Sequence, residues 1–135
     1  MDGVAALRAV LAANADLAAI VALDNISAGP RPVGMPLPSV MISRVSANDR
    51  NIPSPGMTRH VRERAQVTVL ARNYPEQKAL LRAVRHAAAD RVGIEVPGIT
   101  NVSIHTEATG PDFMSEDTSI WIGVQDFIVT YTETR

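Results

Sequence analysis

Alternating side chains from Arg59 to Ala71 constrain the fold more than any other feature of the sequence. Valine and alanine recur on one side, whereas arginine, glutamine and threonine occupy the other. Because successive side chains of a strand point to opposite faces, this period predicts a strand. Glu63 falls on the apolar side, and Arg62 and Arg64 fall on the polar side. One face is therefore expected to meet the core, and the other to meet water or a neighbouring molecule.

Two helical pieces are predicted at the start of the chain. Asp2 can cap a helix whose apolar residues recur at helical spacing until about Ala13. Asn14 can cap a second piece that continues an apolar face to about Ala22. The amino-terminal region is therefore expected to lay an amphipathic stripe on the sheet.

A third helix is predicted directly after the alternating strand. Asn73 can serve as its cap, Pro75 fits the first turn, and Glu76 completes a capping box. We expect this helix to run to about Arg91 and to end before Gly93. Its apolar stripe is expected to belong to the core.

Further strands are predicted by β-branched content and alternation at residues 25–27, 39–46, 100–107 and 117–133. Prolines between residues 29 and 38 predict an extended connector, and residues 47–58 predict a long hairpin loop. Residues 108–116 are interpreted as an acidic turn. We expect a single α+β domain over residues 1–135, with an antiparallel or mixed sheet of about four to five strands and helices packed on one side.

Composition excludes several classes of function. The chain has 135 residues, no cysteine and a formal net charge of -1. Without cysteine it has no disulfide, thiolate metal ligand or thiol nucleophile. The charge offers no general attraction to nucleic acid or to an anionic membrane. No secretory signal and no apolar run of about 20 residues is present, so we expect synthesis in the cytoplasm and no membrane partner.

Catalytic and metal-binding patterns are lacking from the sequence. His60, His86 and His105 are scattered, without the spacing that metal sites commonly use. The carboxylates around residues 107–117 match no calcium loop and are interpreted as a solvated turn or an acidic patch that meets another subunit. We predict no enzymatic activity, no metal and no cofactor.

Polar residues near the predicted hairpin loop are the candidate interface. The run from Arg59 to Arg64 is the densest basic segment, and it suits an intersubunit ion-pair surface as well as a solvated face. Asp126 lies within the last predicted strand. An exposed position on a sheet edge is favoured there over a covered carboxylate that needs a partner. The candidate interface residues are Asn48, Asp49, Arg50, Asn51, Met57, Arg59, Arg62, Arg64 and Asp126.

Several short segments occur in an order that resembles a known family. They are Ala-Asp-Leu-Ala-Ala-Ile-Val at 15–21, Pro-x-x-x-Pro-Leu-Pro at 32–38, Arg-Ala-Gln-Val-Thr-Val-Leu-Ala at 64–71, Tyr-x-Glu-x-Lys-Ala-Leu at 74–80, and Val-Gln-Asp-Phe-Ile-Val at 124–129. Together they resemble the tail completion or tail terminator family of long-tailed phages and related gene transfer agents.

The resemblance implies a structural virion protein at the head-tail junction. Such a protein forms a homo-oligomeric, hexameric ring on the tail tube protein, stops tube polymerisation and meets a head-completion or stopper protein. It implies no direct recognition of nucleic acid sequence. Two alternatives stay open: a head-tail adaptor or stopper of the same particle, and a dimeric α+β domain that binds a small ligand.

Overall fold

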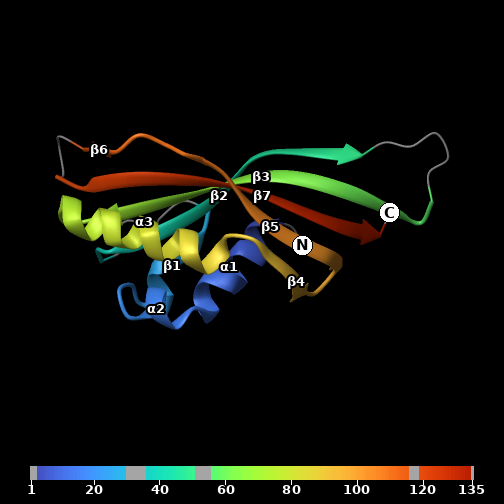
Figure 1. The fold of residues 1–135 in the computed structure, drawn as a ribbon, viewed down its shortest axis with the longest axis horizontal. Helices are drawn as coiled ribbons and strands as arrows, with labels where there is room; N and C mark the ends of the chain where they lie inside the picture. Colours follow the sequence, from blue (N-terminus) through green and yellow to red (C-terminus); the bar gives the residue numbers. More distant parts are fainter. Residues whose placement is uncertain (1–2, 30–35, 51–55, 116–118, 135) are drawn as a thin grey trace.

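The computed structural model describes residues 3–29, 36–50, 56–115 and 119–134. In chain order its elements are α1 (Gly3–Ala13), α2 (Ala15–Ala18), a 3-10 turn (Leu23–Asn25), β1 (Ile26–Ala28), β2 (Ser39–Arg50), β3 (Thr58–Ala71), α3 (Tyr74–Ala88), β4 (Arg91–Val96), β5 (Ile99–Thr109), β6 (Phe113–Met114) and β7 (Trp121–Thr134). Figure 1 shows the helices together against one side of a curved sheet.

The sheet is mixed and has seven strands in the order β1-β2-β3-β7-β5-β4, with β6 paired to β7. Among the strands that the structure describes, only β1 and β2 pair in parallel, and the other pairs are antiparallel. The α+β class and the mixed sheet are confirmed, but the expected count of about four to five strands is wrong. The sequence analysis missed β4, whose residues are mostly exposed and whose register with β5 is irregular, and β6, which is very short.

One face of the sheet carries the core. Inward residues of β3 alternate with outward ones, and the alternation predicted from the sequence is confirmed from Val61 to Val69. Phe127 of β7 is completely buried at the centre, and Gly123 of the same strand lies directly beneath α3. The helices contribute the opposite wall of this core, through Leu7, Leu11, Leu80 and Val84.

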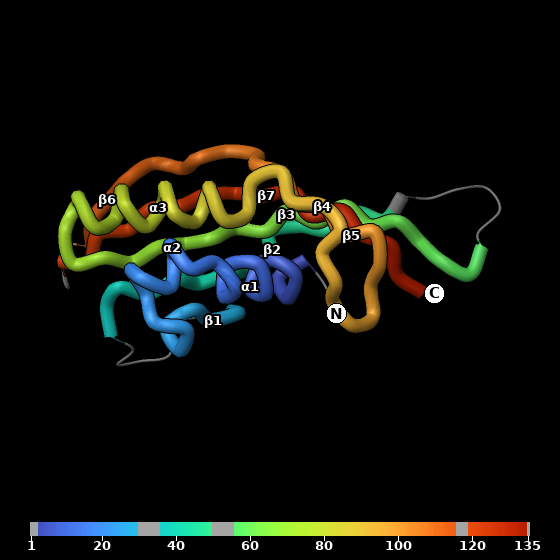
Figure 2. The backbone as a smooth tube through the Cα atoms, turned by 60° about the horizontal axis from the view of Figure 1, so that its bottom comes forward, coloured from blue at the N-terminus to red at the C-terminus, as the bar shows by residue number. Residues whose placement is uncertain are grey.

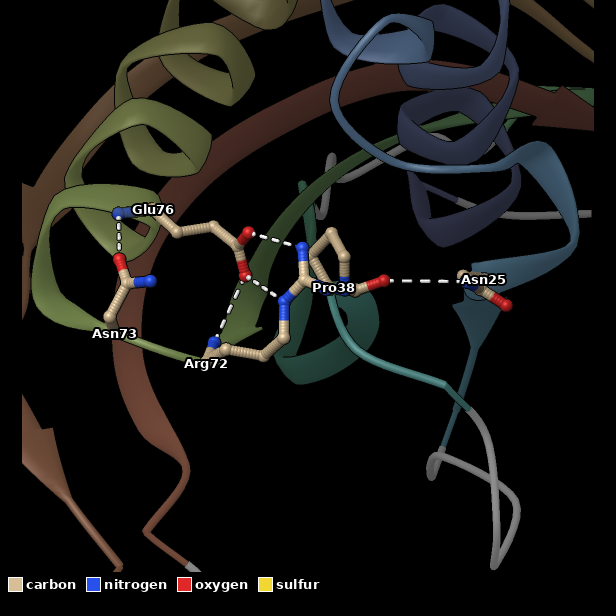
Figure 3. A network of polar contacts seen from close by, with 5 residues as sticks. All are labelled: Asn25, Pro38, Arg72, Asn73 and Glu76. Atoms are coloured by element: carbon tan, nitrogen blue, oxygen red, sulfur yellow. Dashed lines mark hydrogen bonds and ion pairs between the residues drawn. The ribbon is translucent and has the colours of Figure 1, made fainter.

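The two asparagine caps form as predicted, with one difference at α3. The side chain of Asn14 accepts a hydrogen bond from Leu17 N at 2.9 Å, and that of Asn73 accepts one from Glu76 N at 2.9 Å. The Glu76 carboxylate, expected to return to the Asn73 amide, accepts from the amide and guanidinium of Arg72 instead (Figure 3). Helix α3 therefore begins where the sequence predicts.

The end of α3 differs from the prediction. The helix ends at Ala88 rather than near Arg91, because Asp90 adopts a positive φ of 54° and the chain turns directly into β4. Gly93, expected to end the helix, lies inside β4, where its φ of 69° accompanies an irregular register with β5. The acidic turn is also shorter than expected, because β5 extends to Thr109 and β6 follows.

The long hairpin loop predicted over residues 47–58 is strand at both of its ends, because residues 47–50 belong to β2 and Thr58 begins β3. Residues 51–55 lie outside the described part of the chain. Residues 43–50 of β2 and 58–64 of β3 continue the antiparallel ladder, with Arg50 opposite His60. We call this pair of strand segments the arm. β3 begins beyond the helical layer, at the end of the molecule where the chain's C terminus lies (Figure 2). The cause of the error is that the polar residues of the arm lack the apolar alternation of a half-buried strand.

The short strand expected at residues 25–27 is present as β1, one residue later. The proline connector falls mostly outside the described residues. No helix in the described part of the chain is long and apolar enough to cross a membrane.

Candidate interaction surface

The face of the sheet opposite the helices carries polar side chains of β3 and β7. Side chains of β3 and β7 that point away from the core lie opposite each other across the ladder, as in the pairs Arg62 with Thr130, Arg64 with Ile128, and Gln66 with Asp126. Both α1 and α3 pack on the other face, so no described helix covers this one. We call it the open face.

An ion pair joins β3 to β7 on the open face. Arg64 donates hydrogen bonds from Nε at 3.1 Å and from Nη2 at 2.5 Å to Oδ2 of Asp126. This hydrogen bonding and the charge of the carboxylate raise the pKa of the Arg64 guanidinium above its ordinary value. Asp126 is only 7% exposed, because β7 lies inside the sheet between β3 and β5. The favoured interpretation of Asp126 as an exposed residue on a sheet edge is therefore wrong.

Arg62 differs from Arg64, although the two lie on the same face. Its side chain is exposed, and it makes no ion pair with any described residue. Asn48 of β2 lies opposite it in the ladder and is also exposed. Arg62 therefore presents an exposed cation on the open face.

Charged residues on the arm form a short chain of ion pairs. Arg59 of β3 lies 3.2 Å from Asp49 of β2 and 3.3 Å from Glu133 of β7, measured between nitrogen and oxygen atoms. These pairs tie the arm to the end of β7. Met57, next to the arm, is 82% exposed. Asn51, the remaining candidate in this region, lies outside the described residues.

A cleft of about 500 Å³ opens where the arm meets β7 and β5. Within it, His60 Nδ1 and Thr132 Oγ1 are 2.9 Å apart and share a hydrogen bond. The cleft brings together residues from four strands, β2, β3, β5 and β7. Its lining consists of Asn48, Asp49, His60, Val61, Arg62, Asn101, Thr130, Tyr131 and Thr132.

Glu63 is a buried carboxylate beneath the first residue of α1. Arg44 Nε lies 2.9 Å from its Oε1, and the hydroxyl of Tyr131 donates to the same oxygen at 3.4 Å. A Cβ on Gly3 would overlap the Glu63 carboxylate group and would lie 3.0 Å from Val129 Cβ. The carboxylate therefore sits at the positive end of the helix dipole, where a negative charge is favoured. Glu63 thus lies between α1 and the sheet at the base of the arm.

Comparison with known proteins identifies the family of this chain. The model of the family described as tail completion protein gp17 matches residues 5–132. The chain belongs to the tail completion protein gp17 family. The resemblance stated from the sequence is thereby confirmed, and the protein is a structural component of a phage-type tail.

A solved structure has the same fold. A chain of a structure titled "Virion of native gene transfer agent (GTA) particle" superposes with a TM-score of 0.69 at 18% identity, covering 96% of this chain and 94% of that chain. At this identity the likeness establishes the fold. No curated protein matches the chain.

One carboxylate of the acidic region of this tail completion protein, Asp112, is paired within the chain. Asp112 accepts hydrogen bonds from Lys78 Nζ at 2.6 Å, Tyr74 Oη at 3.0 Å and Gln77 Nε2 at 3.2 Å. The hydrogen bond from Lys78 is the main reason why the pKa of the Asp112 carboxyl is lowered. Asp112 thus fastens the chain after β5 to α3. Of the other carboxylates in this region, Glu107 is exposed, and residues 116–118 lie outside the described part.

The histidines of the tail completion protein lie far apart in the sequence and on different elements. His86 is exposed on α3, and His105 Nδ1 lies 2.9 Å from Asp90 Oδ1. The contacts of Glu63 and Asp112 were not predicted from the sequence. For Glu63 the sequence did contain a signal, because its charge falls on the apolar side of an alternating strand. A charged group in that position needs a partner.

Proposed function

We propose that this tail completion protein closes the tail tube as a ring of identical subunits. In this role it binds the last ring of the tube protein, stops further polymerisation, and presents its other side to a head-completion or stopper protein. Family membership supports work in the tail. The ring, its hexameric order and its location at the head-tail junction are parts of the proposal.

The exposure of the arm is the observation that supports the proposal. All side chains from Ser43 to Asp49 are exposed, on both faces of β2, whereas the first part of the same strand is buried between neighbours. A strand segment ordered in the sheet but covered on neither face offers a surface for other subunits. A capping ring needs such surfaces, because it must match the tube on one side and fail to reproduce the tube's own surface on the other.

The candidate interface residues take different parts in this proposal. We assign partner contacts to Asn48, Arg62 and Met57, whose side chains are exposed. Arg59 forms an ion pair with Asp49 within the arm, and Arg64 forms one with Asp126 on the open face, so we assign these four a part in shaping the surface. Arg50 is the last residue of β2, and Asn51 lies outside the described residues.

Electron microscopy of the protein mixed with its cognate tube protein tests the proposal. We expect a cap at one end of each tube and shorter tubes as the cap protein increases. An Arg62→Glu variant is expected to occupy tube ends about tenfold less well or worse, because a reversed charge at a contact is costly. The matched control is Arg82→Glu, on the exposed face of α3.

Other outcomes of the same mixing experiment point elsewhere. Failure of the wild-type protein to bind tube ends would overturn the proposal. Binding to the portal or head-completion proteins without binding to the tube would identify a head-tail adaptor or stopper.

The cleft beside His60 supports a second candidate, the binding of a small ligand. A ligand retained by a dimer in native mass spectra, and lost in a His60→Ala variant, would establish this function. We give it second place because the cleft is built from the arm, which the tail function already requires.

A further inference from the structure

Both outer edges of the sheet are open at the same end of the molecule. β1 pairs with β2 only from Val40 to Ile42, and Gly29 adds one hydrogen bond to Ile42 O. From Ser43 to Arg50 the outer edge of β2 has no strand partner in the described residues. On the opposite side of the sheet, β4 pairs only with β5 among the described strands.

The ladders place these two open edges at the same level. Arg91 of β4 lies opposite Ile104 of β5, and Ile104 lies opposite Val129 of β7. Val129 in turn lies opposite Glu63 of β3, which lies opposite Ala47 of β2. One row of paired residues therefore crosses the sheet from β4 to the arm.

The two edge strands also run in the same direction. Each step from β2 through β3, β7 and β5 to β4 is antiparallel, so β2 and β4 are parallel to each other. A rotation about an axis along the strands would bring β4 of one copy beside β2 of the next, still in parallel. The same edge of β2 already accepts β1 in parallel.

An exposed valine stands on each open edge. Val45 of β2 is 52% exposed, and Val92 of β4 is 71% exposed. Valine suits a strand that is covered by a neighbour, and an open edge with exposed apolar residues promotes pairing between chains. Charges do not oppose the contact, because the described part of each edge carries both signs: Arg44 with Asp49, and Arg91 with Glu95.

We propose that β4 of one copy pairs in parallel with residues 43–50 of β2 in the next copy. This inference rests on the proposed ring and names the contact that closes it. The pairing is heterologous, so repetition around an axis leaves no open edge once the ring closes. If β2 of one copy paired with β2 of another, β4 and Val92 would stay uncovered. We therefore assign β4 of the neighbouring copy as the strand that pairs with the open edge of β2.

Cysteine cross-linking tests the contact directly, because the natural chain has no cysteine. A chain with both Val45→Cys and Val92→Cys, treated with a short bismaleimide, is expected to give a ladder of covalent multimers that ends at the ring order. Each single variant is expected to give no ladder, since two copies of the same edge do not meet. A Val45→Cys/Leu23→Cys chain is the matched control, with a second exposed residue away from β4.

Charge substitution provides an independent readout of assembly. Val45→Lys and Val92→Lys are each expected to raise the protein concentration needed for ring formation about tenfold or more, because charged side chains on an edge oppose pairing. The Val45→Lys/Val92→Lys chain should remain unassembled. The Val45→Lys/Val92→Glu chain should recover assembly, since every contact then joins opposite charges.

The possible results separate this inference from the proposed function. Tube caps that form with no ladder from the double cysteine chain, with or without tube present, would overturn the edge pairing and leave the function standing. Dimers from Val45→Cys alone would also overturn it, in favour of a symmetric contact. A ladder from a protein that does not bind tube ends would support the pairing and overturn the function.

Discussion

Arg64 and Asp126 are adjacent on the open face, where the guanidinium donates two hydrogen bonds to a single carboxylate oxygen. The sequence separates them widely, and the β3–β7 ladder brings them together. Asp126 is buried by the sheet, whereas Arg64 is partly exposed. The pair therefore stabilises the fold from the same surface that we propose for partner binding.

Removal of Arg64 is expected to destabilise the protein. Arg64→Ala leaves a nearly buried carboxylate without its ionic partner, and such a group is costly to keep charged. The matched control, Arg62→Ala, is expected to leave the midpoint of urea unfolding nearly unchanged, since Arg62 makes no ion pair within the described chain. Equal effects of the two variants would contradict a stabilising role for the pair. In a double-mutant cycle, Arg64→Ala and Asp126→Ala together should cost less than the sum of the two.

Gly3 is expected to tolerate no side chain. A methyl group there would overlap the Glu63 carboxylate and crowd Val129, so Gly3→Ala should lower the free energy of unfolding by about 1–3 kcal/mol. Gly56→Ala is the matched control, because nothing lies within 4 Å of a Cβ at that position. Its effect should stay within about 0.5 kcal/mol. Denaturant unfolding of both variants measures the difference, and a harmless Gly3→Ala would show that α1 is not tightly seated on Glu63.

Acid should weaken the start of α3 through Glu76. Hydrogen bonding from Arg72 lowers the pKa of the Glu76 carboxyl from 4.5, against the opposing effect of burial. Because the folded pKa lies below the unfolded value, the stabilisation is present above about pH 4.5 and is lost as pH falls through the folded pKa. The free energy of unfolding, measured in urea between pH 7 and pH 3, is therefore expected to depend less on pH in the Glu76→Gln variant than in the wild-type protein. Glu95→Gln, at an exposed position, should retain the wild-type profile.

Alkali is expected to unfold the protein through Tyr131. Burial, assisted by the charges of Glu63 and Glu133, raises the pKa of Tyr131 from 10.0 to about 12. The folded pKa exceeds the unfolded one, so the stabilisation is complete below about pH 10 and is lost as pH rises toward 12. The chain has only two tyrosines, so a Tyr74→Phe variant isolates the tyrosinate absorbance of Tyr131. Titration near pH 10 without unfolding would contradict the burial that we describe.

Local signals in the sequence determined much of the fold. The alternation of β3 and the Asn73 cap of α3 could be read directly, because strand faces and helix ends depend on residues close together in the chain. The family resemblance was also carried by local segments. Residues with weak local signals were misassigned: residues 47–50 of the arm were predicted as part of a loop, and the exposed, irregular β4 was not predicted.

The sequence by itself therefore determined the core face of β3, the start of α3 and membership in the tail completion family. Only the tertiary structure decided that Asp126 is buried, that Arg64 rather than Arg62 is its partner, and that β2 and β4 leave open edges at one end. The physical reason is that side-chain burial and edge exposure depend on strand order. Strand order is set by pairings between residues far apart in the chain, which local periodicity does not encode.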